Sequence, residues 1–136
     1  MLNSYIIYPM GIVRKNEEKI WIEIYDEFTD ALLGLEGFSH INVLYWFHEN
    51  DTPAKRKTLQ VHPRGDKKNP LTGVFATHSP VRPNLIALTL CKILSIKESR
   101  IIIEDIDALD GSPVIDIKCY IPHDASDSSY RVPEWV

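Results

Sequence analysis

The sequence lacks any apolar stretch long enough to cross a membrane. Within its 136 residues, no hydrophobic run approaches the roughly 20 residues that a bilayer requires. The opening, MLNSYIIYPM, has no basic segment followed by a long apolar one, so we expect no secretory signal. These absences predict a cytoplasmic protein that does not associate with membranes.

Cysteine is scarce, and metal-binding patterns are missing. Cys91 and Cys119 lie far apart with no CxxC spacing, which favours buried reduced thiols over a zinc or redox pair. The histidines show no tight ligand spacing either and are typical of hydrogen-bonded or surface positions; they are His40, His48, His62, His78 and His123. We therefore predict no metal site.

Three common catalytic motifs are also absent. There is no GxGxxG, no GKS/T phosphate loop and no GxSxG elbow, so dinucleotide-binding, P-loop and α/β-hydrolase chemistry lack support. His78 and Ser79 are adjacent, but neighbours on an extended backbone point to opposite faces. We do not expect them to act as a nucleophile and its base.

Charge is unevenly distributed along the chain. Residues 53–84 hold seven Lys or Arg and one acid, whereas the other 104 residues hold eight bases and eighteen acids. A segment of formal charge +6 thus lies in a background of −10. Such separation can steer a polyanion to one face, although a solvated loop is the simpler alternative.

Short strands dominate the expected secondary structure. We predict strands at residues 5–13, 20–24, 41–47, 85–94, 101–103 and 114–121, one helix at 26–35 capped by Asp26, and a long loop at 53–71 with a helical turn near Lys55. No βαβ rhythm is visible. The predicted fold is mainly β, a small antiparallel β-barrel with one short helix and a long basic loop. We expect the barrel to occupy residues 1–122 and a tail, 123–136, to pack on the barrel or on a second copy.

Two further stretches favour a functional site. Residues 73–84, GVFATHSPVRPN, are expected to begin as a strand and continue as a loop with Arg82 between Pro80 and Pro83. Proline fixes φ and restricts the preceding residue, so this loop should be stiff, and its guanidinium is suited to an anion. Residues 107–110 form an acidic turn that ends in Asp110-Gly111, a sequence typical of turns.

Three motifs together resemble a known family. GLEGFSHINVLYWFHEN, GVFATHSPVRPN and DALDGSPVIDIKCYIP occur in this order between residues 34 and 122. They are similar to the motifs of the TrmO/YaeB (TsaA-like) family, two of which read approximately GVFATRSPxRPNPIG and DxxDGTPVLDIKPYxP. Such long matches covering most of the chain are far more specific than a short pattern.

The resemblance implies an activity and a set of contacts. It implies a homodimeric β-barrel enzyme that uses S-adenosyl-L-methionine to methylate the exocyclic nitrogen of threonylcarbamoyladenosine, beside the anticodon of tRNA. The implied cofactor contacts are His48, Glu49, His78, Leu88, Asp107, Ala108, Leu109 and Asp110. The basic segment would hold phosphates of the tRNA anticodon arm, and the residues predicted to contact tRNA are Arg64, Lys67, Lys68 and Arg82.

The residue types suit this chemistry, but their individual roles stay open. A sulfonium can be stabilised by Asp107 or Asp110, or by the aromatic face of Tyr45 or Trp46. The acceptor nitrogen must also lose a proton, for which the candidate bases are His48, His78 or an aspartate.

The chain departs from the family pattern at three places. Residues 14–19 form a short turn where longer family members have an insert that helps to bind the cofactor. His78 stands where the family has Arg, and residues 85–87 (LIA) replace Pro-Ile-Gly. Two alternatives therefore remain: a non-catalytic nucleotide- or RNA-binding barrel, and a methyltransferase with a different acceptor.

Overall fold

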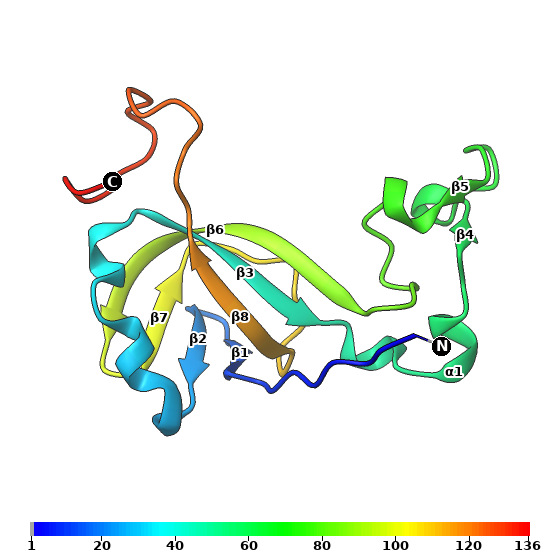
Figure 1. Ribbon diagram of the computed structural model, residues 1–136, viewed down its shortest axis with the longest axis horizontal. Coiled ribbons are helices and arrows are strands. Elements are labelled where there is room, and N and C mark those ends of the chain that lie inside the picture. The colour runs from blue at the N-terminus through cyan, green and yellow to red at the C-terminus, as the bar shows by residue number, and fades with distance from the viewer. Residues whose placement is uncertain (1) are drawn as a thin grey trace. The chain divides into compact units, whose positions relative to one another are not determined.

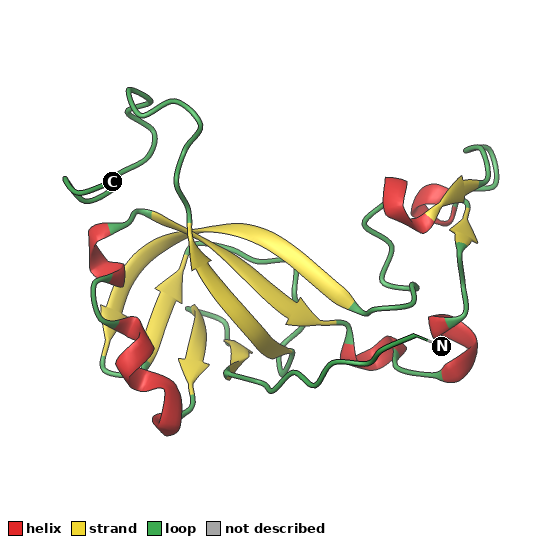
Figure 2. Ribbon diagram, in the orientation of Figure 1, coloured by secondary structure: helices red, strands yellow, loops and turns green. Residues whose placement is uncertain are grey.

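The computed structural model describes residues 2–136 and is built mainly from strands (Figures 1 and 2). It divides into two compact units. The first, which we call the barrel unit, contains the chain up to Tyr45 together with 88–136. The second, the basic unit, contains residues 46–87 and thus most of the basic segment.

Six strands close into a barrel in the order β1-β2-β7-β6-β3-β8. Strand β1 pairs antiparallel with β2 and β8, β2 with β7, β3 with β8 and β6 with β7. The sequence predicted this antiparallel arrangement. The strands are β1 (Gly11–Lys15), β2 (Ile20–Ile24), β3 (His40–Trp46), β6 (Ile86–Lys97), β7 (Arg100–Ile103) and β8 (Pro113–Cys119). The predicted fold class is confirmed.

Alternating side chains fill the barrel. Along β3, Ile41, Val43 and Tyr45 are buried, while the residues between them are only partly covered. This is the period of two that a strand with one face in a core must show. The largest fully buried side chains of the barrel unit come from all six of its strands: Val13, Ile22, Ile41, Val43, Cys91, Ile101, Ile103 and Val114.

The hairpin of β1 and β2 follows the prediction closely. Strand β2 has the expected bounds, and Lys15 pairs with Ile20 across the turn. The side-chain oxygen of Asn16 accepts hydrogen bonds from the backbone of Glu18 and Lys19, at 2.8 and 2.7 Å, which closes the turn.

The strand predicted at residues 5–13 was wrong in its first half. Strand β1 begins only at Gly11, and Tyr5 and Ile6 are exposed. Pro9 cannot donate to a strand ladder, and apolar side chains without a surface to cover gain nothing from strand geometry.

The predicted helix at 26–35 was also wrong in type and cap. The structure has two 3-10 helices, η1 (Asp26–Leu32) and η2 (Leu35–Gly37). Gly34 between them adopts φ 88°, a left-handed conformation that ends a helix. The N-cap is Tyr25, without a side-chain cap bond, so Asp26 does not cap.

The C-terminal tail contacts the barrel unit. Ser39 and Arg131 exchange two hydrogen bonds, from the Ser39 backbone N–H to the Arg131 carbonyl at 2.9 Å and from the Arg131 N–H to the Ser39 hydroxyl at 2.7 Å. The ring of Tyr130 lies 4.7 Å from that of His40 and 4.8 Å from that of Tyr120. These contacts order the tail against β3 and the end of β8.

The basic unit contains short elements only. They are η3 (His48–Asn50), α1 (Pro53–Arg56), β4 (Gln60–Val61), η4 (Pro63–Gly65), β5 (Thr72–Gly73) and η5 (Val74–Ala76). The helical turn expected near Lys55 is present as α1. The rest of the predicted loop contains β4 and η4, and β4 pairs with β5, which begins just after the loop. Residues 74–76 form a 3-10 turn instead of the predicted strand.

No helix among residues 2–136 combines the length and the hydrophobicity that a membrane crossing would need.

Candidate functional site

In the basic unit, Arg56 joins α1 to the end of the proline-rich loop. Helix α1 begins after Thr52, whose hydroxyl accepts the backbone N–H of Lys55 at 3.3 Å, an ordinary N-cap. The guanidinium of Arg56 donates through Nε to the Pro83 carbonyl at 2.9 Å and lies 5.4 Å from the ring centroid of Trp46. These contacts make Arg56 a structural residue.

The loop between β4 and β5 presents positive charge. Arg64, Lys67 and Lys68 are exposed on it. Arg64 has φ 61°, a left-handed conformation that costs a non-glycine residue roughly 1–3 kcal/mol and that clusters at functional sites. Asp66 organises the loop, because its carboxylate accepts the backbone N–H of Lys68 at 2.9 Å.

Residues 77–82 form a loop that is held by its own hydrogen bonds. The hydroxyl of Thr77 donates to the Val74 carbonyl at 2.9 Å, and the hydroxyl of Ser79 accepts the N–H of Val81 at 3.1 Å. Arg82 Nη1 donates to the carbonyls of Thr77 and Ser79, at 3.1 and 3.2 Å. One guanidinium nitrogen of Arg82 therefore stiffens the loop, and Nε and Nη2 take no part in these two bonds.

A cavity of about 770 Å³ lies between these two loops of the basic unit. One wall is formed by residues 61–65 and the other by residues 76–81. The cavity brings His78, an implied cofactor contact, together with Arg64, a predicted tRNA contact. It also contains His62, to which the sequence assigned no function.

His62 is fixed by its surroundings. Its Nδ1 lies 2.9 Å from the carbonyl oxygen of Asn69, and the Asn69 amide nitrogen donates to the Pro63 carbonyl at 2.8 Å. Because a carbonyl can only accept, Nδ1 carries the proton and Nε2 of the neutral ring has the lone pair. The only signal for this residue in the sequence was the His-Pro-Arg-Gly stretch of residues 62–65, within the predicted loop of residues 53–71.

In the barrel unit, the acidic turn is anchored by alternate side chains. Ile106 and Ala108 are buried, whereas Asp107, Leu109 and Asp110 are exposed. Ala108 is buried as a whole residue, so it supports the turn and presents almost no surface to a ligand.

Lys15 fixes the two ends of this turn. Its Nζ donates to the Ile106 carbonyl at 2.7 Å, and its backbone N–H donates to Asp110 Oδ1 at 2.9 Å. One oxygen of Asp110 is thus used within the fold, whereas the exposed carboxylate of Asp107 makes no hydrogen bond or ion pair within residues 2–136.

Asp107 acts electrostatically on side chains of β3 and β6. Burial is the main cause that raises the pKa of the Cys91 thiol to about 12, and the negative charges of Asp105 and Asp107 add to it. Burial likewise raises the pKa of Tyr45, with a smaller contribution from Asp107 against a hydrogen bond to Thr89 at 3.3 Å. Leu88, the third residue of β6, is exposed.

His48 and Glu49 follow β3 within the short helix η3. His48 is half-buried and Glu49 is exposed. No cluster of three or more His, Cys, Asp or Glu side chains that could hold a metal ion occurs among residues 2–136.

Comparison with known proteins identifies the family. Residues 8–126 match the tRNA-methyltransferase O N-terminal domain, TrmO_N. The chain belongs to the TrmO family. It is 50% identical over 116 residues to a probable S-adenosyl-L-methionine-binding protein of Methanocaldococcus jannaschii, a match that covers 85% of this chain and 92% of that protein.

Relatives with more specific names are longer. A human tRNA (adenine(37)-N6)-methyltransferase is 42% identical over 99 residues, 72% of this chain and 22% of that protein. The crystal structure of TrmO from Pseudomonas aeruginosa superposes with a TM-score of 0.69 at 28% identity, covering 94% of this chain. The chain spans 61% of that TrmO molecule.

The three TrmO-like motifs occupy defined places in the structure. The first runs through η2 and β3 into η3, the second contains η5 and the loop of residues 77–82, and the third contains the acidic turn and β8. In the TrmO-like loop, His78 replaces the family arginine as an exposed side chain of the basic-unit cavity.

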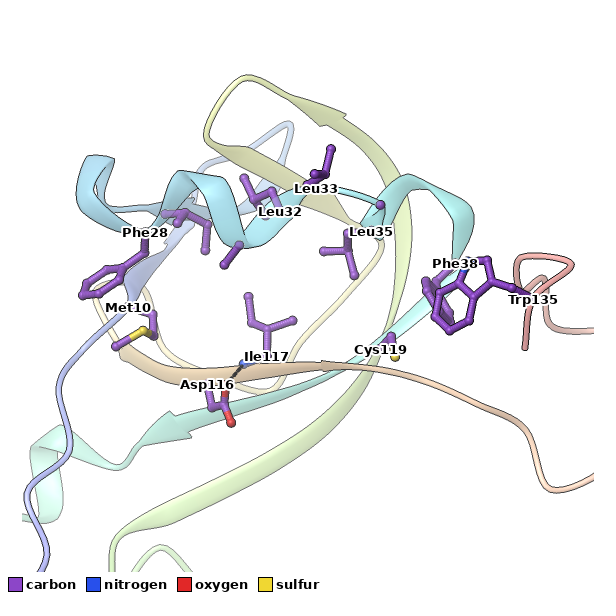
Figure 3. A pocket seen from close by; sticks show the side chains of 13 residues that line it. Met10, Phe28, Leu32, Leu33, Leu35, Phe38, Asp116, Ile117, Cys119 and Trp135 are labelled. Carbon is purple, nitrogen blue, oxygen red and sulfur yellow. Dashed lines mark hydrogen bonds between the residues drawn. The ribbon is translucent and has the colours of Figure 1, made fainter.

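A second cavity of about 330 Å³ lies in the barrel unit, and none of the residues that line it belongs to the loop of residues 77–82 (Figure 3). Phe28, Leu32 and Leu35 line it from the 3-10 helices, with Ile117 and Cys119 of β8 opposite. Of the described residues around it, Asp116 alone carries a charge. The described lining of this cavity is therefore mainly apolar.

Proposed function

We propose that this protein transfers a methyl group from S-adenosyl-L-methionine to the exocyclic nitrogen of threonylcarbamoyladenosine in the tRNA anticodon arm, in the cytoplasm. Membership of the TrmO family carries the proposal. The name of the human relative supports an adenine nitrogen as the acceptor, and the name of the Methanocaldococcus relative supports the cofactor.

The residues that we assign to cofactor binding are of types that suit the cofactor. When bound, it supplies an electrophilic methyl group on a positively charged sulfur. Asp107 offers an exposed carboxylate for that charge, whereas one oxygen of Asp110 is already bonded to the backbone of β1. Within the basic unit we assign polar contacts to His48, Glu49 and His78, and within the barrel unit apolar contacts to Leu88 and Leu109, of the kinds that an amino acid and a nucleoside need. Ala108 is buried and shapes the turn between Asp107 and Leu109.

The basic unit fits the tRNA. Arg64, Lys67 and Lys68 are exposed on one loop, and phosphates are recognised mainly by such side chains. Arg82 contributes the guanidinium nitrogens that its loop does not use. The stiffness of that loop lowers the ordering cost of binding.

We further propose a homodimer that uses the outer face of β6. Leu90 and Leu94 lie on this face on either side of the exposed Lys92 and are 41% and 57% exposed. The sequence predicted that both faces of β6 would be covered by other parts of the protein. In the single chain its outer face is exposed. Exposed leucines on a barrel strand favour a second subunit as the cover.

Incubation of the pure protein with methyl-labelled cofactor and total tRNA tests the activity. We expect label in the tRNA fraction. Salt-sensitive tRNA binding without label would instead favour a non-catalytic RNA-binding barrel. Label on a small molecule or protein, with tRNA inert, would favour a different acceptor.

A further inference from the structure

We infer that His62 is the general base of this reaction, accepting through Nε2 the proton that the acceptor nitrogen loses. The inference rests on the proposed function and assigns a residue that the sequence left without a role. It is carried by three observations in the basic unit: a cavity, a fixed tautomer and the residues that share the cavity.

The tautomer gives His62 a free lone pair. Nδ1 is committed to the Asn69 carbonyl at 2.9 Å, so the proton of the neutral ring cannot sit on Nε2. The same asparagine is held by its side chain to Pro63 at 2.8 Å and by its backbone N–H to Asp66 at 3.0 Å. A ring fixed in this way by a second group is the usual arrangement of a catalytic histidine.

His62 lines a cavity of substrate size. Its volume of about 770 Å³ is within the range of roughly 300–1,000 Å³ that ligand pockets occupy. The other charged or titratable side chains that line it are Arg64 and His78. Arg64 is suited to an anionic group of the acceptor nucleoside.

His62 is better placed than His78 to act as the base. His62 is half-buried and its ring is hydrogen-bonded to Asn69, whereas His78 is exposed and its ring makes no hydrogen bond within residues 2–136. A base must be held within hydrogen-bond reach of the proton that it removes, and the structure fixes only the first of these two rings.

The step balances as a simple displacement. The acceptor nitrogen forms a bond to the methyl carbon as the carbon–sulfur bond breaks, and the sulfur keeps the electron pair of that bond. The nitrogen proton passes to Nε2 of His62, which becomes an imidazolium and later releases the proton to water. Donation from Nδ1 to the Asn69 carbonyl stabilises that imidazolium.

Two substitutions of His62 distinguish three roles of its ring: a general base, a hydrogen-bond acceptor and a structural side chain. In His62→Asn the side-chain amide can keep the bond to Asn69 but has no atom at Nε2. In His62→Gln the side-chain amide oxygen can lie near the position that Nε2 occupies in the wild type, where it can accept a hydrogen bond but cannot act as a base. Single-turnover rates with saturating cofactor and tRNA should fall about 100-fold or more in both variants, while tRNA affinity and the thermal midpoint stay near the wild-type values.

The pH profile adds a readout that a structural role would not change. In the wild type the single-turnover rate should fall on the acid side as the imidazole is protonated, and this limb should be absent from the residual rate of His62→Asn. If His62→Asn stays within threefold of an active wild type, or His62→Gln restores the full rate, the inference is wrong although the proposed function stands. If the wild type transfers no methyl group to tRNA, both fail.

Nitrogen-15 NMR of the imidazole tests the tautomer without any turnover. We expect the His62 proton on Nδ1 at neutral pH, with the His78 ring in exchange between tautomers. A proton fixed on Nε2 of His62 would remove the lone pair and overturn the inference.

Discussion

Asp107 is the residue on which cofactor binding should depend most. Asp107→Asn preserves the shape of the side chain but removes the negative charge that, in our proposal, stabilises the positively charged sulfonium. We expect the calorimetric Kd for S-adenosylmethionine to rise about tenfold, corresponding to ~1.4 kcal/mol. Asp116→Asn is the matched control, because Asp116 is an exposed carboxylate of the same unit that lies 3.6 Å from Lys118. Equal Kd values for the wild type and both variants would show that Asp107 does not contact the cofactor.

His40 should make the stability of the protein depend on pH. Burial, and then the positive charge of Lys92, lowers the pKa of His40 below 6.5, with Glu104 opposing. The folded state therefore favours the neutral ring, so the stabilisation is present above pH 6.5 and is lost as the pH falls below that value. Urea midpoints measured from pH 7.5 to 5 should fall more steeply for the wild type than for His40→Asn.

His123→Asn provides the control for that measurement, because His123 is exposed in the tail. Its urea midpoints should follow those of the wild type at every pH. Parallel curves for the wild type and His40→Asn would contradict the account of His40.

At the scale of elements, the loop between β4 and β5 should act as the phosphate-binding segment. Replacing Lys67 and Lys68 by Ala removes two exposed charges. The slope of log K against log salt for tRNA binding should become shallower by about two. The control is Lys19→Ala with Lys97→Ala, two exposed lysines of the barrel unit. A slope changed equally by both pairs would indicate diffuse attraction and no dedicated loop.

The sequence predicted the barrel strands well because their signal is local. Strands β2 and β3 alternate or concentrate strand-forming residues, and their bounds were right to within one residue. Residues 26–35 show helical spacing too, but the left-handed Gly34 interrupts it. Residues 74–76 are apolar and read as a strand, yet the hydroxyl of Thr77 closes a turn on them.

The site was less predictable because it depends on contacts distant in sequence. The motifs suggested which residues matter, but no pattern shows that Lys15 takes one oxygen of Asp110, 95 residues away. The role of Asn69 in orienting His62 is likewise visible only once the loop is folded. Arg82 was expected to meet an anion, and the structure shows in addition that it stiffens its own loop.

At the scale of the whole molecule, the outer face of β6 predicts association. Light scattering at micromolar concentration should give the mass of two chains. Leu90→Asp with Leu94→Asp should give monomers, because two charges would be buried in the interface. Leu2→Asp, on an exposed side chain outside the barrel strands, is the control and should leave the dimer intact. A wild-type monomer would exclude the proposed interface.

The identity of the methylated nucleoside tests the central claim most directly. Two preparations of one tRNA, with and without threonylcarbamoyladenosine beside the anticodon, are incubated with the protein and S-adenosylmethionine, then digested and analysed by mass spectrometry. The account predicts one added methyl group on threonylcarbamoyladenosine and no methylated product from the other preparation. Methylation of neither preparation, or of a different nucleoside in both, would contradict it.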